Sequence, residues 1–210
     1  MNEVRMNTRN HWERVYQSKE ADAVSWFRPH LERSLSLIEK AAPDPAMSII
    51  DIGGGESTLV DDLLGAGYFD VSALDISQAA IDATRQRLGL AGNAVAWWVG
   101  DVTQVTLPRA RYDVWHGKAV FHFLTDLAQR QAYARLLMHA VKPGSHVIVA
   151  TFGPEDPSKC SVLDVVRYDA DGLHGEFGDA FRLVESATEV HDTPFGTSQQ
   201  FIYCYCVKSS

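Results

Sequence analysis

The stretch IIDIGGGEST, residues 49–58, decides the fold of this chain. It starts with a short apolar run, passes through three glycines and leads into a segment with helical spacing. A glycine at such a turn lets a ligand approach the backbone where a side chain would collide. A dinucleotide fingerprint based on Gly53 and Gly55 requires a third glycine where Thr58 stands, and a P-loop requires Gly-Lys-Ser/Thr. The stretch matches neither pattern.

From Met47 onward, short apolar runs alternate with helical segments, which is the signature of a parallel sheet wrapped by helices. The predicted parallel strands are residues 48–52, 70–74, 95–99, 112–115 and 146–151. The predicted helices are residues 57–66, 78–88, 126–140 and about 169–176. Two final strands follow, and the turn sequence between them predicts an antiparallel hairpin formed by residues 181–190 and 200–207.

The first 46 residues differ from the rest of the chain. Helical spacing predicts helices over residues 7–19 and 29–42, and an aromatic and basic connector that ends at Pro29 separates them. We expect residues 1–46 to form a helical lid or support on a core of residues 47–210, within one domain of residues 1–210.

Composition excludes several classes of partner. A chain of 210 residues with 46% hydrophobic content can bury a sizeable core. Its net charge of -8 and pI near 5.4 argue against binding to nucleic acid or to an anionic membrane surface. No apolar run reaches the length of a membrane span, and the polar start lacks the apolar core of a signal peptide. We therefore expect a cytoplasmic protein with a small-molecule substrate, or else a protein substrate.

The three cysteines form neither an even disulfide framework nor a Cys-x-x-Cys motif, so free thiols are expected. Cys204 and Cys206 alternate with tyrosines in a predicted strand and should share one sheet face. Cys160 lies in a loop-like segment and is the cysteine that could serve function. The histidines show no metal-ligand spacing, and no metal is expected.

Two carboxylates follow the second and third predicted strands. Asp75 could accept hydrogen bonds from both hydroxyls of a ribose, or it could merely cap the next helix, a role that suits Ser77 better. Asp101 could accept from an adenine amino group while Val102 packs near the ring, although it could also cap a turn. The carboxyl ends of parallel strands meet at one edge of the sheet, so these groups should face one crevice.

On these residues the chain resembles the class I S-adenosylmethionine-dependent methyltransferases over residues 48–207. Their first motif, acidic-x-Gly-x-Gly-x-Gly, is matched by Asp51, Gly53 and Gly55, with Ser57 in the last glycine position. The resemblance implies a Rossmann-like α/β fold: a seven-stranded, mostly parallel sheet in the order 3-2-1-4-5-7-6, with a C-terminal antiparallel hairpin and helices on both faces. It also implies S-adenosyl-L-methionine as cofactor and S-adenosyl-L-homocysteine as product.

Several segments look most like small bacterial methyltransferases of unassigned substrate: HWE at 11–13, VSWF at 24–27, VFHFL at 120–124 and VVRY at 165–168. A more distant resemblance is to lysine methyltransferases that act on proteins. Methyl transfer to a small-molecule nitrogen, oxygen or sulfur is the leading interpretation, and protein lysine methylation is the alternative. A noncatalytic cofactor- or partner-binding module is a third possibility, and an NAD-dependent oxidoreductase is the weakest.

Candidate site residues follow from these positions. Cofactor contacts are expected from Asp51, Gly53, Gly54, Gly55, Asp75, Ile76, Asp101, Val102, His116, Trp12 and Trp26. The tryptophans, with Tyr16 and Phe27, could face the sulfonium through cation-π attraction, or they could permanently anchor the N-terminal helices. The exit of the fourth strand also offers Lys118. Acceptor contacts are expected from Phe27, Arg28, Phe121, Phe152, Cys160, Arg167, Tyr168 and Phe195.

His122 is the expected general base, because histidine titrates near neutral pH and this one should lie just beyond the fourth strand. The competing interpretation is a structural histidine that caps the next helix.

Overall fold

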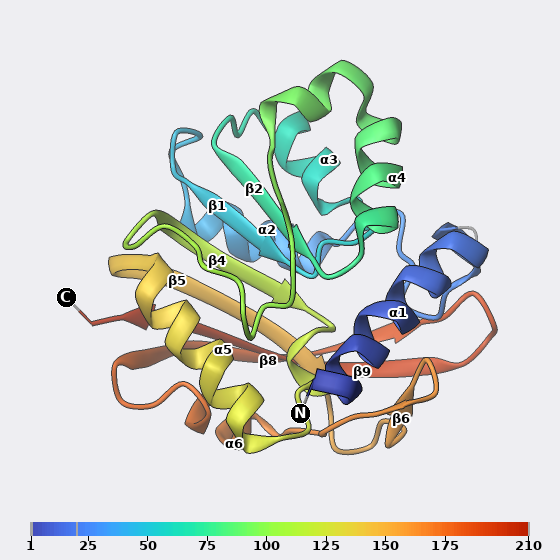
Figure 1. Ribbon diagram of the computed structural model, residues 1–210. Coiled ribbons are helices and arrows are strands. Elements are labelled where there is room, and N and C mark those ends of the chain that lie inside the picture. The colour runs from blue at the N-terminus through green and yellow to red at the C-terminus, as the bar shows by residue number, and fades with distance from the viewer. Residues whose placement is uncertain (1, 20, 210) are drawn as a thin grey trace.

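The computed structural model describes residues 2–19 and 21–209 (Figure 1). At its centre is a seven-stranded sheet in the order β3-β2-β1-β4-β5-β9-β8. Two short strands, β6 (Lys159–Cys160) and β7 (Leu163–Asp164), form a separate sheet. The sixth and seventh strands of the main sheet are therefore labelled β8 and β9, and the observed order is the expected 3-2-1-4-5-7-6. The predicted α/β fold is confirmed. Met1 and Ser210, the ends of the expected single domain, lie outside the described residues.

Five parallel strands form the first part of the sheet: β1 (Ile49–Ile52), β2 (Val71–Asp75), β3 (Ala96–Val99), β4 (Tyr112–Lys118) and β5 (Val141–Phe152). Every residue of β1 is buried, because helices cover both faces of the sheet centre and leave no side of the strand for solvent. The predicted fourth strand ended three residues too early. As a result, His116 and Lys118 lie within β4 rather than in the loop beyond it.

Helices cover the two faces of the sheet (Figure 1). On one face lie α2 (Glu32–Ala41), α3 (Leu59–Gly65) and α4 (Gln78–Leu88), and on the other lie α5 (Leu127–Ala140) and α6 (Ala170–Gly175). Short 3-10 helices occupy η1 (Ala21–Ala23), η2 (Gly89–Ala94) and η3 (Phe121–Phe123). Asp126 begins α5 with a capping box to Gln129, which fixes the loop that leaves β4. Among the described residues, no helix is both long and apolar enough to cross a membrane.

The chain ends in the predicted antiparallel hairpin, formed by β8 (Phe181–Asp192) and β9 (Ser198–Lys208). The strand β9 also pairs antiparallel with β5, which brings it next to the parallel part of the sheet. Cys204 and Cys206 are buried with their Sγ atoms 3.2 Å apart, so the prediction that they share one face is confirmed.

The two helices of the N-terminal segment lie in different parts of the structure. The helix α2 belongs to the helical layer of the core, where Leu37 and Ile38 are buried. By contrast, α1 (Asn2–Ser18) lies across the carboxyl ends of the parallel strands (Figure 1). The Glu13 carboxylate holds it there by accepting hydrogen bonds from Ser77 Oγ at 2.7 Å and from the backbone N–H of Ala79 at 3.2 Å. A carboxylate at the N-terminus of α4 also interacts favourably with the helix dipole.

Gly53 forms the turn that ends β1. Its φ is +71°, in the left-handed region, and a Cβ at this position would lie 2.0 Å from Cγ2 of Val120. The turn therefore requires glycine for both its backbone conformation and its close contact with the loop after β4.

We predict that Gly53→Ala lowers the free energy of unfolding by about 1–3 kcal/mol or more, because the left-handed backbone and the contact with Val120 both disfavour a Cβ. Gly65→Ala is the matched control, since no atom lies within 4 Å of a Cβ there. It should be neutral or stabilise by about 0.5–1 kcal/mol. Urea denaturation measures both, and equal stability of the two variants would contradict this account of the turn.

Candidate functional site

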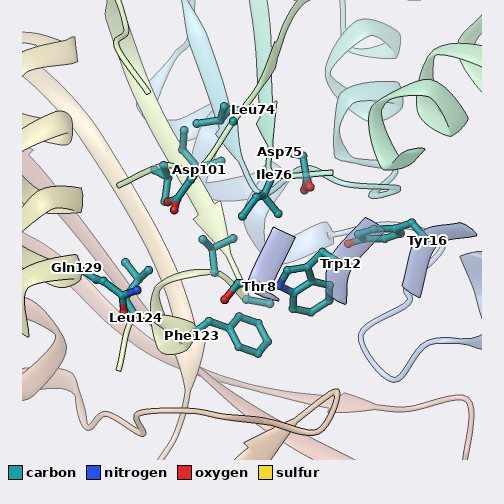
Figure 2. Close-up of a pocket in the computed structure, with 16 residues that line it drawn as sticks. Thr8, Trp12, Tyr16, Leu74, Asp75, Ile76, Asp101, Phe123, Leu124 and Gln129 are labelled. Carbon is teal, nitrogen blue, oxygen red and sulfur yellow. The ribbon is translucent and has the colours of Figure 1, made fainter. Parts of the chain in front are cut away.

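A crevice opens at the carboxyl ends of β1, β2 and β3 (Figure 2). Its walls are mainly apolar, and two carboxylates, Asp75 and Asp101, lie on them where β2 and β3 end. The helix α1 roofs it with Thr8, Trp12 and Tyr16. The remaining lining residues are Ile52, Gly53, Leu74, Ile76, Gly100, Val102, Ala119, Val120, Phe123, Leu124 and Gln129. The crevice thus combines the expected glycine turn with both expected carboxylates.

Asp75 is 5% exposed, and the described residues provide it with no cationic partner. Its Oδ1 accepts from the backbone N–H of Ser77 at 2.8 Å, while Ser77 Oγ caps α4 by accepting from Ala80 N–H at 3.2 Å. The cap is therefore Ser77, as predicted. Burial raises the pKa of Asp75 to about 7; the charge of Asp51 adds to this rise, and backbone N–H groups of Ser77 and Gly55 oppose it.

Asp101 both stabilises a turn and lines the crevice. Its Oδ1 accepts from the N–H and the hydroxyl of Thr103, and its Oδ2 accepts from Gln104 Nε2 at 3.0 Å. These bonds form the capped turn that was the alternative interpretation. Asp101 nevertheless lines the crevice beside Val102, and its Oδ2, which accepts one hydrogen bond, has a further lone pair to offer a donor.

The aromatic residues of the N-terminal segment form the roof and are packed against one another. Trp12 makes edge contacts with Trp26 and Phe123, with ring centroids 5.6 and 5.0 Å apart. The Tyr16 hydroxyl lies so near Gly55 that a Cβ there would approach it to 2.7 Å. Burial raises the pKa of Tyr16 well above its usual value, and the neighbouring Asp75 charge adds to the effect. The phenol therefore stays neutral beside the crevice.

A smaller cavity, which we call the inner chamber, adjoins the crevice. Both are lined by Gly53, Ala119 and Phe123, together with Trp12 and Tyr16, and the chamber adds Trp26, Lys118, Phe152, Cys160 and Phe201. Ala119 has a left-handed φ of 60°, a strained conformation for a residue other than glycine. Such strain is found most often where a site constrains the backbone.

Lys118 and Cys160 are the polar side chains that β4 and β6 contribute to the inner chamber. Burial lowers the pKa of Lys118 to about 8, partly opposed by Glu189, so the ammonium form predominates at pH 7. Burial raises the pKa of Cys160 to about 11, with a smaller contribution from Asp156, so its thiol is protonated and is not a ready nucleophile.

A third cavity continues the site toward α2. Its lining includes Phe27, Arg28, Asp51, Gly54 and His116, all of them expected site residues. The Asp51 and His116 side chains are paired, with Oδ1 and Nδ1 2.7 Å apart, and His116 Nε2 lies 2.9 Å from Ser34 Oγ. Both partners are almost fully buried, so this pair fixes the end of β1 against β4.

The expectation that His122 is a general base is not supported. Its side chain is fully buried in η3, lies outside the cavities described above, and packs edge-on against Phe123 and tilted against Phe152, with centroids 4.4 Å away in each case. Its Nδ1 accepts from the backbone N–H of Phe152 at 3.3 Å. Burial lowers the pKa of His122 to about 3, with a contribution from Lys118, so it is a weak base with a structural position.

Four expected acceptor contacts lie elsewhere. Phe121 packs into the core against Tyr133, Phe177 and Tyr168. The Tyr168 hydroxyl points to Glu176 and donates to its Oε1 at 3.2 Å. Arg167 is exposed and donates to the carbonyls of Pro154 and Asp156, and Phe195 is 63% exposed at the hairpin tip. The corrections share one cause: proximity to a strand exit in sequence does not determine which way a side chain points.

Other lining residues were absent from the expected set, notably Thr8, Phe123, Leu124, Gln129 and Phe201. Phe201 enters from the antiparallel strand β9, which runs opposite to the strands used for the prediction. Lys118, at the exit of the fourth strand, is not among the expected acceptor contacts. The signal that could have identified it is a lysine at the carboxyl end of a strand whose preceding residues are buried.

The sheet order, the glycine turn and the two carboxylates at the carboxyl edge are those that the resemblance to class I S-adenosylmethionine-dependent methyltransferases implies. Residues 49–144 match the family model of a methyltransferase domain. This segment, which contains the glycine turn and both carboxylates, is therefore identified as a methyltransferase domain.

Comparisons with individual proteins agree with this class. The eEF1A lysine and N-terminal methyltransferase of Mus musculus is 29% identical over 105 residues, which are 50% of this chain and 15% of that protein. The malonyl-acyl-carrier-protein O-methyltransferase of Serratia marcescens is 28% identical over 142 residues, 63% of this chain and 46% of that protein. The chain thus spans less than half the length of either curated relative.

Two solved structures show the same fold. One, described as "Conversion of a Disulfide Bond into a Thioacetal Group during Echinomycin Biosynthesis", has a TM-score of 0.76 at 17% identity and covers 96% of this chain and 92% of that one. The N-methyltransferase NodS of Bradyrhizobium japonicum WM9, in complex with S-adenosyl-L-homocysteine, has a TM-score of 0.73 at 16% identity, covering 97% and 100%.

We predict that Asp75→Asn stabilises the ligand-free protein at pH 8. Because the folded-state pKa is raised, the favourable contribution of protonated Asp75 is complete below its ordinary pKa of 3.8 and is lost as pH rises through about 7. An amide does not ionise, so the variant should gain about 1–4 kcal/mol at pH 8 and little at pH 4. Denaturant melts at the two pH values measure this difference.

Asp82→Asn, at an exposed position on the following helix α4, is the matched control and should show no such pH-dependent gain. A gain for Asp75→Asn that is equal at pH 4 and pH 8 would show that the carboxyl group does not titrate in the range given.

Proposed function

We propose that the crevice binds S-adenosylmethionine and that the chain transfers its methyl group to a small molecule held in the inner chamber. The observation that carries the proposal is the Asp75 carboxylate, which is buried at the end of β2 without a cation among the described residues. A buried carboxylate is costly unless donors reach it. The two hydroxyls of a ribose are such donors.

The residues of the crevice fit the adenosine portion of this cofactor. Asp75 would accept from the ribose hydroxyls and Asp101 from the adenine amino group, as expected from sequence. Ile76 and Val102 would pack on the two sides of the base region. Gly53, which lines both the crevice and the inner chamber, marks where the reactive end would meet the acceptor.

When bound, the cofactor supplies an electrophilic methyl group on a sulfonium. The task of the chain is then to align the acceptor and exclude water, since methyl transfer is an in-line displacement. Trp12, Tyr16 and Phe123 would exclude water, because they line the crevice and the chamber together. Their ring faces also suit a sulfonium, which aromatic quadrupoles attract.

A small-molecule acceptor suits the inner chamber better than a protein side chain. The α1 roof and the connector at Trp26 enclose the chamber, and its lining is mostly apolar. Similarity to the eEF1A lysine and N-terminal methyltransferase keeps protein lysine methylation as the alternative. The cytoplasmic location stays a prediction.

We predict that S-adenosylmethionine and S-adenosylhomocysteine both bind and that their affinity rises as pH increases through about 7. Ribose hydroxyls favour the ionised form of Asp75, so binding lowers its pKa and releases a proton. Asp75→Ala should weaken both ligands by about 1.5–3 kcal/mol, the range for hydrogen bonds to charged groups. Calorimetry at pH 6 and pH 8 measures both effects.

Asp82→Ala is the control for binding and should match the wild type. If Asp75→Ala binds S-adenosylhomocysteine as tightly as wild type at both pH values, Asp75 does not contact the cofactor. If the wild type binds neither ligand, the proposed function is wrong.

We predict that α1 opens to exchange the cofactor. Trp12 and Tyr16 close the crevice, and the Glu13 contacts with Ser77 and Ala79 hold the helix shut. S-adenosylhomocysteine should therefore increase hydrogen-exchange protection over residues 12–28, and Glu13→Ala should speed its dissociation severalfold. Protection that is the same with and without ligand would instead make these aromatics a permanent part of the core.

A further inference from the structure

The inner chamber contains a buried cation for which the chain provides incomplete compensation. Lys118 is 7% exposed, and the nearest oxygen of its carboxylate neighbour, Glu189 Oε2, lies 3.7 Å from Nζ, longer than a hydrogen bond. On its other side, Nζ lies 4.0 Å from the centre of the Phe201 ring. A cation-π contact of this kind favours the charged form without neutralising it.

Glu189 is shared with other groups. Its Oε1 lies 3.3 Å from Arg28 Nη1, and its Oε2 accepts from the Tyr203 hydroxyl at 3.3 Å. Two cations, Lys118 and Arg28, therefore face one largely buried carboxylate. Arg28 has a second carboxylate partner in Glu32, but that side chain is 70% exposed and its charge is screened by solvent. Glu189 therefore balances only part of the combined charge of Lys118 and Arg28, and the excess positive charge lies at Lys118, which lines the chamber.

The other ionisable groups near Lys118 do not supply the missing negative charge. His122 and His191 have lowered pKa values because they are buried, so both are neutral at pH 7. Tyr16 and Cys160, which line the chamber, have raised pKa values and are neutral as well. The carboxylates of Asp51, which is hydrogen-bonded to His116, and of Glu56 line the third cavity, which Lys118 also borders, and not the inner chamber.

On this basis we propose that the acceptor, in the methyl transfer of the proposed function, is a small apolar molecule with one anionic group, a thiolate, phenolate or carboxylate, paired with the Lys118 ammonium. The apolar body would lie against Phe152, Phe201 and Trp26. The chamber offers one cation to the ligand, which suits a monoanion better than a phosphate dianion. An amine acceptor, including a protein lysine, would bring a second cation beside Lys118 and is disfavoured.

The reaction balances without a further reactant. The anionic sulfur or oxygen contributes an electron pair to a new bond to the methyl carbon, and the bond from that carbon to the sulfonium sulfur breaks with its pair left on sulfur. Where the acceptor enters protonated, the neutral fraction of Lys118 accepts its proton and becomes the ammonium that pairs with the anion. Lys118 therefore contacts the acceptor in both cases: it pairs with an acceptor that enters as an anion, and it takes the proton of an acceptor that enters protonated.

The test compares ligands of similar size and opposite charge. Binding of benzoate and of benzylamine is measured by calorimetry to the wild type with and without S-adenosylhomocysteine, a cofactor form that cannot methylate either probe. Benzoate should bind at least tenfold more tightly than benzylamine. Its affinity should fall as pH rises above the range in which Lys118 is protonated, near 8 in the free protein and higher in the complex.

Variants at Lys118 separate its charge from its bulk. Lys118→Met should weaken benzoate at least tenfold, and Lys118→Arg should retain most of the affinity. Both should bind S-adenosylhomocysteine within twofold of the wild type, because Lys118 does not line the crevice. Lys159→Met, the same substitution at an exposed lysine on β6, is the matched control. Thermal melts should show that Lys118→Met is no less stable than wild type, since it removes a buried charge.

Methyl transfer from labelled cofactor to thiophenol, 4-nitrophenol and benzoate then identifies which anion reacts. The inference is overturned if benzylamine binds as well as benzoate, if neither probe binds, or if Lys118→Met leaves benzoate affinity unchanged. Each of these results can occur while S-adenosylhomocysteine binds normally, which leaves the proposed function intact. Failure of S-adenosylhomocysteine to bind overturns the proposed function instead, and the benzoate measurement without it still decides the charge preference of the chamber.

Discussion

The burial of two opposite charges on either side of the Gly53 turn is the constraint on which the site depends. Asp75 faces the crevice and has no cationic partner among the described residues. Lys118 faces the inner chamber, and its carboxylate partner, Glu189, is shared with Arg28. Among the described residues, the ion pair of Lys118 is with Glu189 and not with Asp75. Each shifts in pKa toward its neutral form, which is the expected result of burial. Such costs are retained at functional sites, where a ligand completes what the chain leaves unpaired.

Backbone strain occurs at the same place. Gly53 and Ala119 both have left-handed φ values, and they line both cavities where β1 and β4 end. The two-residue turn after Cys160 also has positive φ at Ser161 and Val162, a geometry that matches a tight hairpin. Ser161 in turn lies 3.1 Å from His11 on α1. The roof, the strand ends and the hairpin that presents Cys160 are therefore positioned by local turns rather than by long loops.

The fold and the main residues of the crevice were predictable from sequence, whereas much of the lining of the inner chamber was not. The run at residues 49–52 and its glycines predict a buried parallel strand and a crevice, because a short apolar run that leads through glycines into a helix is typical of the strand end where ligands bind. Asp75 and Asp101 follow directly from strand ends. Lys118 and Phe201 depend on which way β4 and β9 direct their side chains, and His122 depends on how tightly η3 packs, so tertiary packing decided all three.

The most direct test of the account is a crystal structure of the protein with S-adenosylhomocysteine and benzoate. The account predicts the ribose hydroxyls within hydrogen-bond distance of the Asp75 carboxylate and the benzoate carboxylate within hydrogen-bond distance of Lys118 Nζ. It also predicts that the Gly53 turn separates the two ligands. A ribose bound away from Asp75, or a benzoate bound outside the chamber while Lys118 keeps its contacts with Glu189 and Phe201, would contradict the central claim.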